Sequence, residues 1–198
     1  MSKINQISSV GVFMGSASGN DPIFKERSEE LGRYLAENGY RLVYGGGQEG
    51  LMGLVAKTVM ANGGQVLGVT PKNLAEFSIP AGQITELVEV SDMNTRKQLM
   101  LQESDAFIAL PGGFGTMEEI AQTISWAKID LHEKPLALFD IDGFYDTFWD
   151  WIEESVQRGF VPPVDMRYVF HGESLTDIFD YFERFEFPSE FQNPENFV

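Results

Sequence analysis

The chain alternates short apolar runs with segments whose apolar residues recur at helical spacing, and this alternation constrains its fold more than any other feature. We interpret six of the runs as strands, over residues 9–14, 41–44, 65–69, 83–90, 106–110 and 135–139. Strands that alternate with helices form parallel sheets covered by helices. We therefore predict an α/β fold, a doubly wound and mostly parallel Rossmann-like sheet with helices on both faces. Such sheets bind ligands outside the carboxyl ends of their strands.

The predicted helices lie between and after these strands. Asp21-Pro22 is typical of a helix start, with the aspartate as N-cap, and Asn38-Gly39 is typical of a helix end. Further helices are predicted from residues 91–98 onward and over 117–129, 144–157 and 175–185, with 135–139 as the last clear strand. Residues 71–82 have no clear period and form either a lid or a long crossover. The tail, residues 187–198, is predicted to be extended.

Composition limits the partners of this fold. A length of 198 residues fits a single domain spanning 1–198, and the formal net charge of −16 disfavours binding to nucleic acid or an anionic membrane. The chain has no cysteine, which excludes thiolate chemistry. Its first residues lack the apolar core of a signal peptide, and no apolar run is long enough to span a membrane. We expect a cytoplasmic protein.

A glycine-rich turn, Pro111-Gly112-Gly113-Phe114-Gly115-Thr116-Met117-Glu118-Glu119, separates a predicted strand from a predicted helix. Backbone N–H groups at a helix N-terminus bind anions, and phosphate is the usual one. Two carboxylates in the first helical turn suggest chemistry beside that anion. The alternative is structural, because Thr116 and Glu119 also fit a capping box.

A second glycine-rich loop follows the strand at 41–44. Its Gly45-x-Gly47-x-x-Gly50 spacing matches the dinucleotide-binding fingerprint, but the next strand does not end in the acidic residue that binds a ribose. We therefore reject a nicotinamide cofactor and interpret the loop as a nucleotide-facing turn, or else as a tight turn with close helix packing. The small loop at Gly15-Ser16 lies at the same predicted edge of the sheet.

Two adjacent basic residues, Arg96 and Lys97, stand out in a chain with only 14 Lys and Arg residues. They follow a strand and so lie at the edge where the glycine-rich loops gather. Most such pairs are simply part of a solvated helix face, and that alternative stays open here.

Taken together, these motifs resemble those of the Lonely-guy (LOG) family. The resemblance rests on 111–119 and on Met93-Asn94-Thr95-Arg96-Lys97, and it extends over about residues 9–170. Three positions depart from the family pattern: Asn94 replaces a usual histidine, Gln48-Glu49 replaces smaller residues, and Ser125 replaces a common threonine. These departures leave the base preference open.

The resemblance implies a phosphoribohydrolase that needs no cofactor. It would cleave the N-glycosidic bond of cytokinin riboside 5′-monophosphates or AMP, giving the free base and ribose 5-phosphate. It implies Arg96 and Glu119 as the catalytic residues. The carboxylate would stabilise an oxocarbenium-like ribosyl cation and orient water. The implied substrate-binding residues are Gly15, Ser16, Gly45, Gly46, Met93, Lys97, Gly112, Gly113, Gly115, Thr116, Glu118 and Ser125.

Two further expectations concern partners and alternatives. The family is typically dimeric, and Trp126, Ile129 and Leu131 are candidates for the homodimer surface. The alternative function is a nucleotide-binding regulatory module that cleaves nothing, although a mere binder has no need to retain both catalytic residues. A pyridoxal-dependent decarboxylase is disfavoured because no lysine has the required context. A metal site is unsupported because His132 and His171 are isolated in the sequence and are expected to be surface or capping residues.

Overall fold

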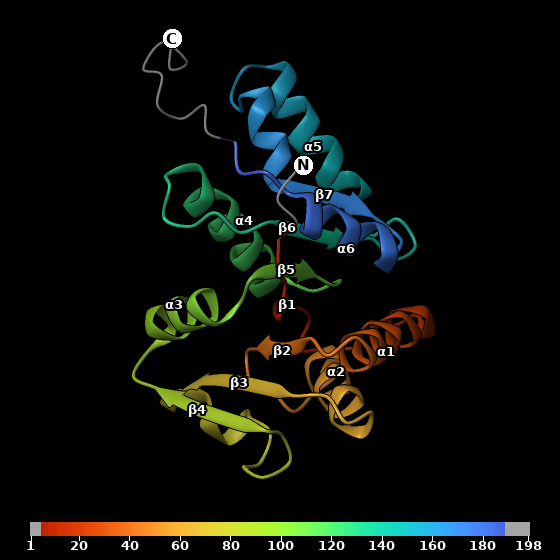
Figure 1. Ribbon diagram of the computed structural model, residues 1–198, viewed down its shortest axis with the longest axis vertical. Coiled ribbons are helices and arrows are strands. Elements are labelled where there is room, and N and C mark those ends of the chain that lie inside the picture. Colours follow the sequence, from red (N-terminus) through yellow and green to blue (C-terminus); the bar gives the residue numbers. More distant parts are fainter. Residues whose placement is uncertain (1–4, 189–198) are drawn as a thin grey trace.

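The computed structural model describes residues 5–188, which fold around one parallel sheet of seven strands (Figure 1). The strand order is β4-β3-β2-β1-β5-β6-β7, and every neighbouring pair is parallel. The strands are β1 (Ser9–Phe13), β2 (Arg41–Tyr44), β3 (Val66–Pro71), β4 (Glu86–Val90), β5 (Ala106–Ala109), β6 (Leu136–Phe139) and β7 (Val169–Gly172). The order reverses between β1 and β5, so the predicted doubly wound fold is confirmed.

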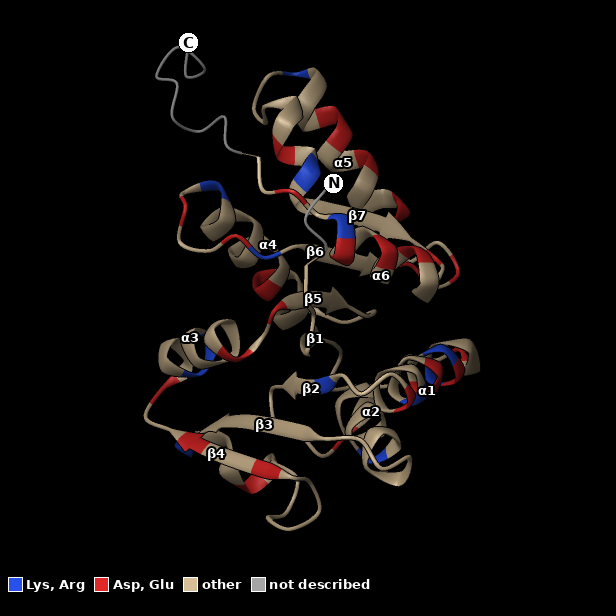
Figure 2. Cartoon of the chain, viewed as in Figure 1, with Lys and Arg blue, Asp and Glu red and all other residues tan. Residues whose placement is uncertain are grey.

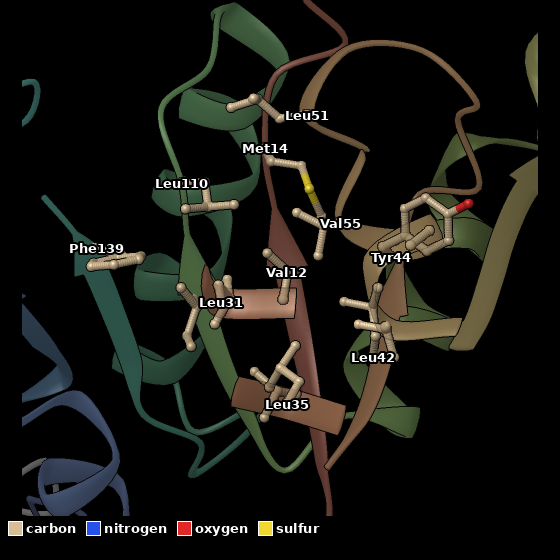
Figure 3. Close-up of a cluster of buried hydrophobic side chains, with 14 of the residues drawn as sticks. Val12, Met14, Leu31, Leu35, Leu42, Tyr44, Leu51, Val55, Leu110 and Phe139 are labelled. Carbon is tan, nitrogen blue, oxygen red and sulfur yellow. The ribbon is translucent and has the colours of Figure 1, made fainter. Parts of the chain in front are cut away.

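Helices cover both faces of the sheet, with α1 and α2 on one side and α3 and α4 on the other (Figure 1). The helices are α1 (Pro22–Glu37), α2 (Gly50–Ala61), α3 (Met93–Glu103), α4 (Phe114–Lys128), α5 (Asp146–Gln157) and α6 (Leu175–Arg184). Side chains of α1, α2 and α6 join one buried cluster, part of which is drawn in Figure 3, and those of α3, α4 and α5 pack in a second. Each central strand therefore contributes alternate residues to two cores.

Local sequence signals explain where several helices start and end. The Asp21 carboxylate caps α1 by accepting a hydrogen bond from the N–H of Ile23, and Asn38 ends the helix. The Asp92 carboxylate caps α3 in the same way. Helix α4 starts at Phe114, three residues before the predicted start, because the glycines extend into the helix instead of preceding it. Strand β7 was not predicted, and the tail beyond residue 188 lies outside the described residues.

The start of α2 depends on a glycine in a left-handed conformation. Gly50 has a φ of +61°, and a Cβ there would lie 2.3 Å from the carbonyl carbon and oxygen of Ser16. We expect Gly50→Ala to lower the free energy of unfolding by about 2 kcal/mol or more, because it adds a backbone clash to conformational strain. Urea denaturation measures this loss.

Gly63 provides the matched control for this substitution. Its φ is +77°, but a Cβ there would meet nothing within 4 Å. The Gly63→Ala variant has the strain without the clash, and we expect it to lose about 1 kcal/mol. Equal losses in the two variants would contradict the packing role of Gly50.

Candidate active site

A cavity of about 640 Å³ opens at the carboxyl ends of the central strands, at the point where the strand order reverses. Binding sites of doubly wound folds occur at this position, and the volume falls in the usual range of about 300–1,000 Å³ for small-molecule sites. The lining comes from the loops after β1, β2, β3 and β5 and from α2, α3 and α4. It consists of Met14, Gly15, Ser16, Gly45, Gly47, Gln48, Glu49, Met52, Thr70, Leu74, Phe77, Ser78, Arg96, Gly113, Phe114, Gly115, Thr116 and Glu119.

The N-terminus of α4 forms one wall of this cavity. Its N-cap is Gly113, which has no side chain to cap the first N–H groups, and those groups have no partner within the helix. Thr116 is buried in the first turn, so it is not the N-cap, and the capping-box alternative for Thr116 and Glu119 is wrong. A Cβ on Gly112 would lie 2.1 Å from the Thr116 hydroxyl oxygen, which explains the glycine there. The wall offers backbone donors and a helix dipole to an anion.

Arg96 and Glu119 meet across the cavity as an ion pair. Arg96 Nη2 lies 3.2 Å from Glu119 Oε1, and the two side chains are only 12% and 11% exposed. Arg96 Nε also donates a hydrogen bond to the Val69 carbonyl, and Nη1 donates one to Met93 Sδ. These contacts fix the plane of the guanidinium. They exclude the interpretation of Arg96 as part of a solvated helix face.

Glu119 is an unusual carboxylate because its burial outweighs its neighbouring positive charges. Desolvation raises the pKa of Glu119 above its ordinary value, and the nearby charge of Glu118 raises it further. Arg96 and Lys97 act in the opposite direction but do not reverse the shift. A carboxyl group in a cleft with a raised pKa and a fixed cationic partner is typical of functional sites.

The structure brings together most, but not all, of the predicted site residues. Those lining the cavity are Gly15, Ser16, Gly45, Arg96, Gly113, Gly115, Thr116 and Glu119. Gly46, Met93 and Gly112 support the wall: the Gly46 carbonyl accepts a hydrogen bond from Ile79, Met93 contacts Arg96, and Gly112 packs on Thr116. Lys97 and Glu118 pair with each other outside the cavity lining. Ser125 is exposed on α4 and does not line the cavity.

Sequence reasoning missed an apolar part of the lining, made by Met14, Met52, Leu74, Phe77 and Phe114. Leu74 and Phe77 come from a 3₁₀ helix, Lys72–Phe77, within the segment that was predicted to be a lid or a crossover. Backbone hydrogen bonds hold this segment to the glycine-rich loop, from Gln48 N to the Phe77 carbonyl and from Ile79 N to the Gly46 carbonyl. The segment is therefore a crossover fixed to the site. Its apolar side chains had no periodic signal that could have identified them.

The sequence left two roles open for the glycine-rich loop after β2, a nucleotide-facing turn and a tight turn with close helix packing, and the loop has both. Gly45 and Gly47 line the cavity, and a Cβ on Gly45 would lie only 1.8 Å from Arg96 Nη2. Gly50 and Gly53 instead allow close packing of α2, since a Cβ on Gly53 would lie 1.8 Å from the Gln48 carbonyl oxygen. The glycines of the fingerprint spacing therefore leave space for the Arg96 side chain and for the close approach of α2.

Both histidines differ from the sequence expectation. His171 is isolated in the sequence but not in the fold: its Nε2 lies 3.3 Å from Asp140 Oδ2, just after β6, and 3.8 Å from Asp146 Oδ1, at the start of α5. His132 is not a surface residue, because it is buried. Its Nε2 bonds to the Thr123 carbonyl of α4, and its Nδ1 accepts a hydrogen bond from the Lys134 N–H. These contacts define a neutral ring with the proton on Nε2.

His132 gives the fold a dependence on pH. Burial lowers the pKa of His132 below its usual 6.5, and the charge of Lys134 lowers it further. The stability it contributes is complete above pH of about 6.5 and decreases as the pH falls from there toward the folded-state pKa. We expect His132→Gln to flatten the acid side of the Tm profile, in the range that begins at a pH of about 6.5 and extends downward. An unchanged slope in thermal unfolding over that range would contradict this role.

The cavity lies where the strand order reverses, beside the uncapped N-terminus of α4 and the buried Arg96–Glu119 pair. These features define a doubly wound α/β protein with an active site that suits an anion.

Comparison with known proteins gives the family. The family described as "Possible lysine decarboxylase" matches residues 52–182. Cytokinin riboside 5′-monophosphate phosphoribohydrolase LOG7 of Arabidopsis thaliana is 42% identical over 175 residues, covering 88% of this chain and 81% of the relative. LOG1 of the same plant is 40% identical over 179 residues, covering 88% and 84%. The chain belongs to this LOG family.

Solved structures support the fold. The molybdenum cofactor carrier protein of Chlamydomonas reinhardtii matches with a TM-score of 0.64 at 19% identity, covering 88% of this chain and 95% of that one. DNA processing protein A of Helicobacter pylori matches with a TM-score of 0.54 at 17% identity, covering 87% and 79%. At such low identity these matches concern the architecture alone.

Proposed function

We propose that this chain is a phosphoribohydrolase. It hydrolyses the N-glycosidic bond of cytokinin riboside 5′-monophosphates or AMP. Water adds its hydroxyl group to the anomeric carbon, the bond to the base breaks, and the base leaves with a proton. The products are the free base and ribose 5-phosphate. The observation that carries the proposal is the buried Arg96–Glu119 pair at 3.2 Å beside the uncapped N-terminus of α4, in a chain about 40% identical to curated phosphoribohydrolases.

The phosphate binds at the N-terminus of α4. Gly113, Gly115 and Thr116 line the cavity there, and the first N–H groups of the helix are available as donors. The net charge of −16 makes such a local donor site necessary, because the protein as a whole repels a nucleotide. Acidic residues occur on β4, α5 and α6 (Figure 2), and the charged residues of the cavity lining are Arg96, Glu49 and Glu119, so the backbone donors of α4 are needed to attract an anion.

Glu119 acts at the anomeric carbon. Its carboxylate lies one turn into α4 from the phosphate-binding N–H groups, on the cavity side. A carboxylate there stabilises the oxocarbenium-like ribosyl cation and orients or deprotonates the attacking water. Arg96 is a poor proton donor because a guanidinium group holds its proton throughout the physiological pH range. Its role is to hold Glu119 in place and to stabilise negative charge on the departing base.

The base lies against the apolar lining. Met14, Met52, Leu74 and Phe77 give this part of the cavity an apolar surface that suits a purine ring and a short hydrocarbon substituent. Glu49, also in the lining, adds a hydrogen-bond acceptor. The preference between plain adenine and a modified adenine is set here.

A chromatographic assay tests this function. Purified protein is incubated with AMP, isopentenyladenosine monophosphate and the two unphosphorylated ribosides. We expect free base from the monophosphates and at least a hundredfold less from the ribosides, because the ribosides lack the anion that positions the sugar. Binding of monophosphates without release of base would contradict hydrolysis and favour the regulatory nucleotide-binding module.

We also propose that the protein acts as a homodimer. Ile129 and Leu131 at the end of α4 are 54% and 59% exposed. Large apolar residues that pack in a subunit interface are exposed in this way when one subunit is considered alone. Trp126 is partly buried in this chain. Sedimentation equilibrium measures the mass, and a mass of one chain at micromolar concentration would contradict the proposal.

No helix among residues 5–188 is long and apolar enough to cross a membrane. The cytoplasmic location stays a prediction.

A further inference from the structure

A cluster of one imidazole and two carboxylates lies at the carboxyl ends of β6 and β7, outside the main cavity. It consists of Asp140, Asp146 and His171, and none of the three lines that cavity. One ligand atom from each residue lies within 4.8 Å of the other two. Because the fold brings distant carboxylates to His171, its isolation in the sequence does not exclude a metal site.

His171 Nε2 is a buried atom without a partner at the centre of this cluster. It is closed to solvent and makes no hydrogen bond to any residue within 5–188, although Asp140 Oδ2 lies 3.3 Å away and Asp146 Oδ1 lies 3.8 Å away. The Asp140 side chain is only 3% exposed, so its Oδ2 is also largely withdrawn from water. Buried polar atoms that face one another without a hydrogen bond between them are unfavourable. A cation between them would satisfy both.

The separations between these atoms fit a tetrahedral metal site. Ligand atoms that lie about 2.0–2.2 Å from a Zn²⁺ ion, at tetrahedral angles, are about 3.3–3.6 Å apart. The two separations from His171 Nε2 are close to these values. The Asp146 side chain is 67% exposed, so its rotation closes the remaining gap, and solvent supplies a water molecule as the fourth ligand. The same exposed side gives an ion a path of entry.

Two of the three ligands are held in place by outer contacts. Asp140 Oδ1 accepts a hydrogen bond from the Tyr145 N–H at 2.9 Å, while Oδ2 of the same carboxylate faces His171. The Trp149 ring stacks on the His171 imidazole, with 5.1 Å between centroids and an angle of 23° between planes. Outer contacts of this kind orient the ligands of metal sites. Ligands that are already oriented lose little side-chain entropy when an ion binds.

We propose that Asp140, Asp146 and His171 bind one divalent transition-metal ion, with Zn²⁺ as the best fit. An imidazole beside two carboxylates suits such ions, whereas Ca²⁺ and Mg²⁺ prefer oxygen ligands alone. The ion has a structural role, because it joins β7, the end of β6 and the start of α5. It also fixes the loop that holds Tyr145, whose hydroxyl donates a hydrogen bond to the Leu110 carbonyl just before the glycine-rich turn of the active site.

Isothermal titration calorimetry with ZnCl₂ tests this site, with untagged protein that has been freed of metal by EDTA. We expect one Zn²⁺ ion per chain. Asp146→Asn is expected to weaken binding at least about tenfold, because even the loss of an outer partner of a metal ligand costs that much. His171→Asn is expected to weaken it in the same way.

Asp142→Asn is the matched control. Asp142 lies in the same loop but outside the cluster, and its φ of +55° is a conformation that asparagine also adopts. Both Asp→Asn variants remove one negative charge, so they have the same effect on a general attraction of cations to the acidic surface. We expect the control to bind Zn²⁺ as the wild type does.

Equal affinity for Zn²⁺ in the Asp142→Asn and Asp146→Asn variants would overturn the proposal, as would a wild-type protein that binds no Zn²⁺. Thermal unfolding provides a second readout. We expect saturating Zn²⁺ to raise the Tm of the wild type and of Asp142→Asn but not that of Asp146→Asn, and an equal rise in all three would contradict the site. Asp146 is exposed, so its substitution leaves the fold intact, which the Tm without metal checks. These measurements involve no nucleotide, so their failure would leave the proposed hydrolase function untouched.

Discussion

Glu119→Gln is expected to reduce hydrolysis of nucleotide monophosphates by about a thousandfold or more, with little loss of nucleotide binding. The amide keeps the shape of the carboxylate but cannot stabilise a ribosyl cation or accept a proton from water. Arg96 keeps its contacts with Val69 and Met93, so the cavity wall stays in place. Single-turnover kinetics with AMP measures the loss, and calorimetric titration measures the affinity. If the variant retained a tenth of the activity, Glu119 would not be a catalytic residue.

The same substitution is expected to stabilise the fold at neutral pH. Burial raises the pKa of Glu119 in the folded state. The stability contributed by this group is therefore greatest below the unfolded-state pKa and is lost as the pH rises through the folded-state value. A neutral glutamine does not suffer this loss. We expect Glu119→Gln to have the higher Tm at pH 8, with the difference disappearing at pH of about 4. A lower Tm at pH 8 would show that the ion pair outweighs the cost of burial.

Gly45→Ala is expected to lower kcat about a hundredfold although both catalytic side chains remain. A Cβ at residue 45 would lie 1.8 Å from Arg96 Nη2 and 2.8 Å from Met52 Cε. The end of a flexible arginine moves more easily than the loop, so the guanidinium is displaced from Glu119. A displacement of about 1 Å in a catalytic site can cost a hundredfold in rate. The variant is expected to fold normally, as measured by circular dichroism.

Gly47→Ala is the matched control for this prediction. It lies in the same loop and lines the same cavity, but the atoms nearest to its Cβ would belong to the flexible Met52 side chain, at 3.0 Å for the sulfur and 3.1 Å for Cε. Arg96 is not displaced, and we expect less than a tenfold change in kcat. Similar losses in the two variants would show that the loop tolerates no side chain, and would refute a specific role of Gly45 in positioning Arg96.

The sequence was sufficient to predict the sheet and most elements because the central strands are short, apolar and buried on both faces. Arg41–Tyr44, for example, was predicted with its exact bounds. Strand β7, Val169–Gly172, was missed because it pairs only with β6 at the edge of the sheet and is mostly half-buried. Its short sequence, Val-Phe-His-Gly, has no alternation to mark it. Helix α4 began earlier than expected because glycine and proline normally indicate a turn.

The candidate site was predictable where function requires a particular residue type. The resemblance of their motifs to the LOG family identified Arg96 and Glu119 as a pair, and they do meet. The apolar lining was not predictable, because Leu74 and Phe77 lie in an irregular crossover that only the folded chain brings back to the glycine loop. Lys97 shows a different limit. Adjacency in sequence suggested a shared role with Arg96, whereas the helical rotation directs its side chain toward Glu118.

The crossover that carries Leu74 and Phe77 also bears on the thermodynamics of ligand capture. Its backbone is already paired with residues 46–48, including an antiparallel bridge between Gly47 and Ser78. A ligand that enters this site meets an ordered surface and does not have to restrict a loose loop, so little conformational entropy opposes association. The heat-capacity change of binding should therefore match the apolar area of one nucleotide, without the added contribution of a folding segment.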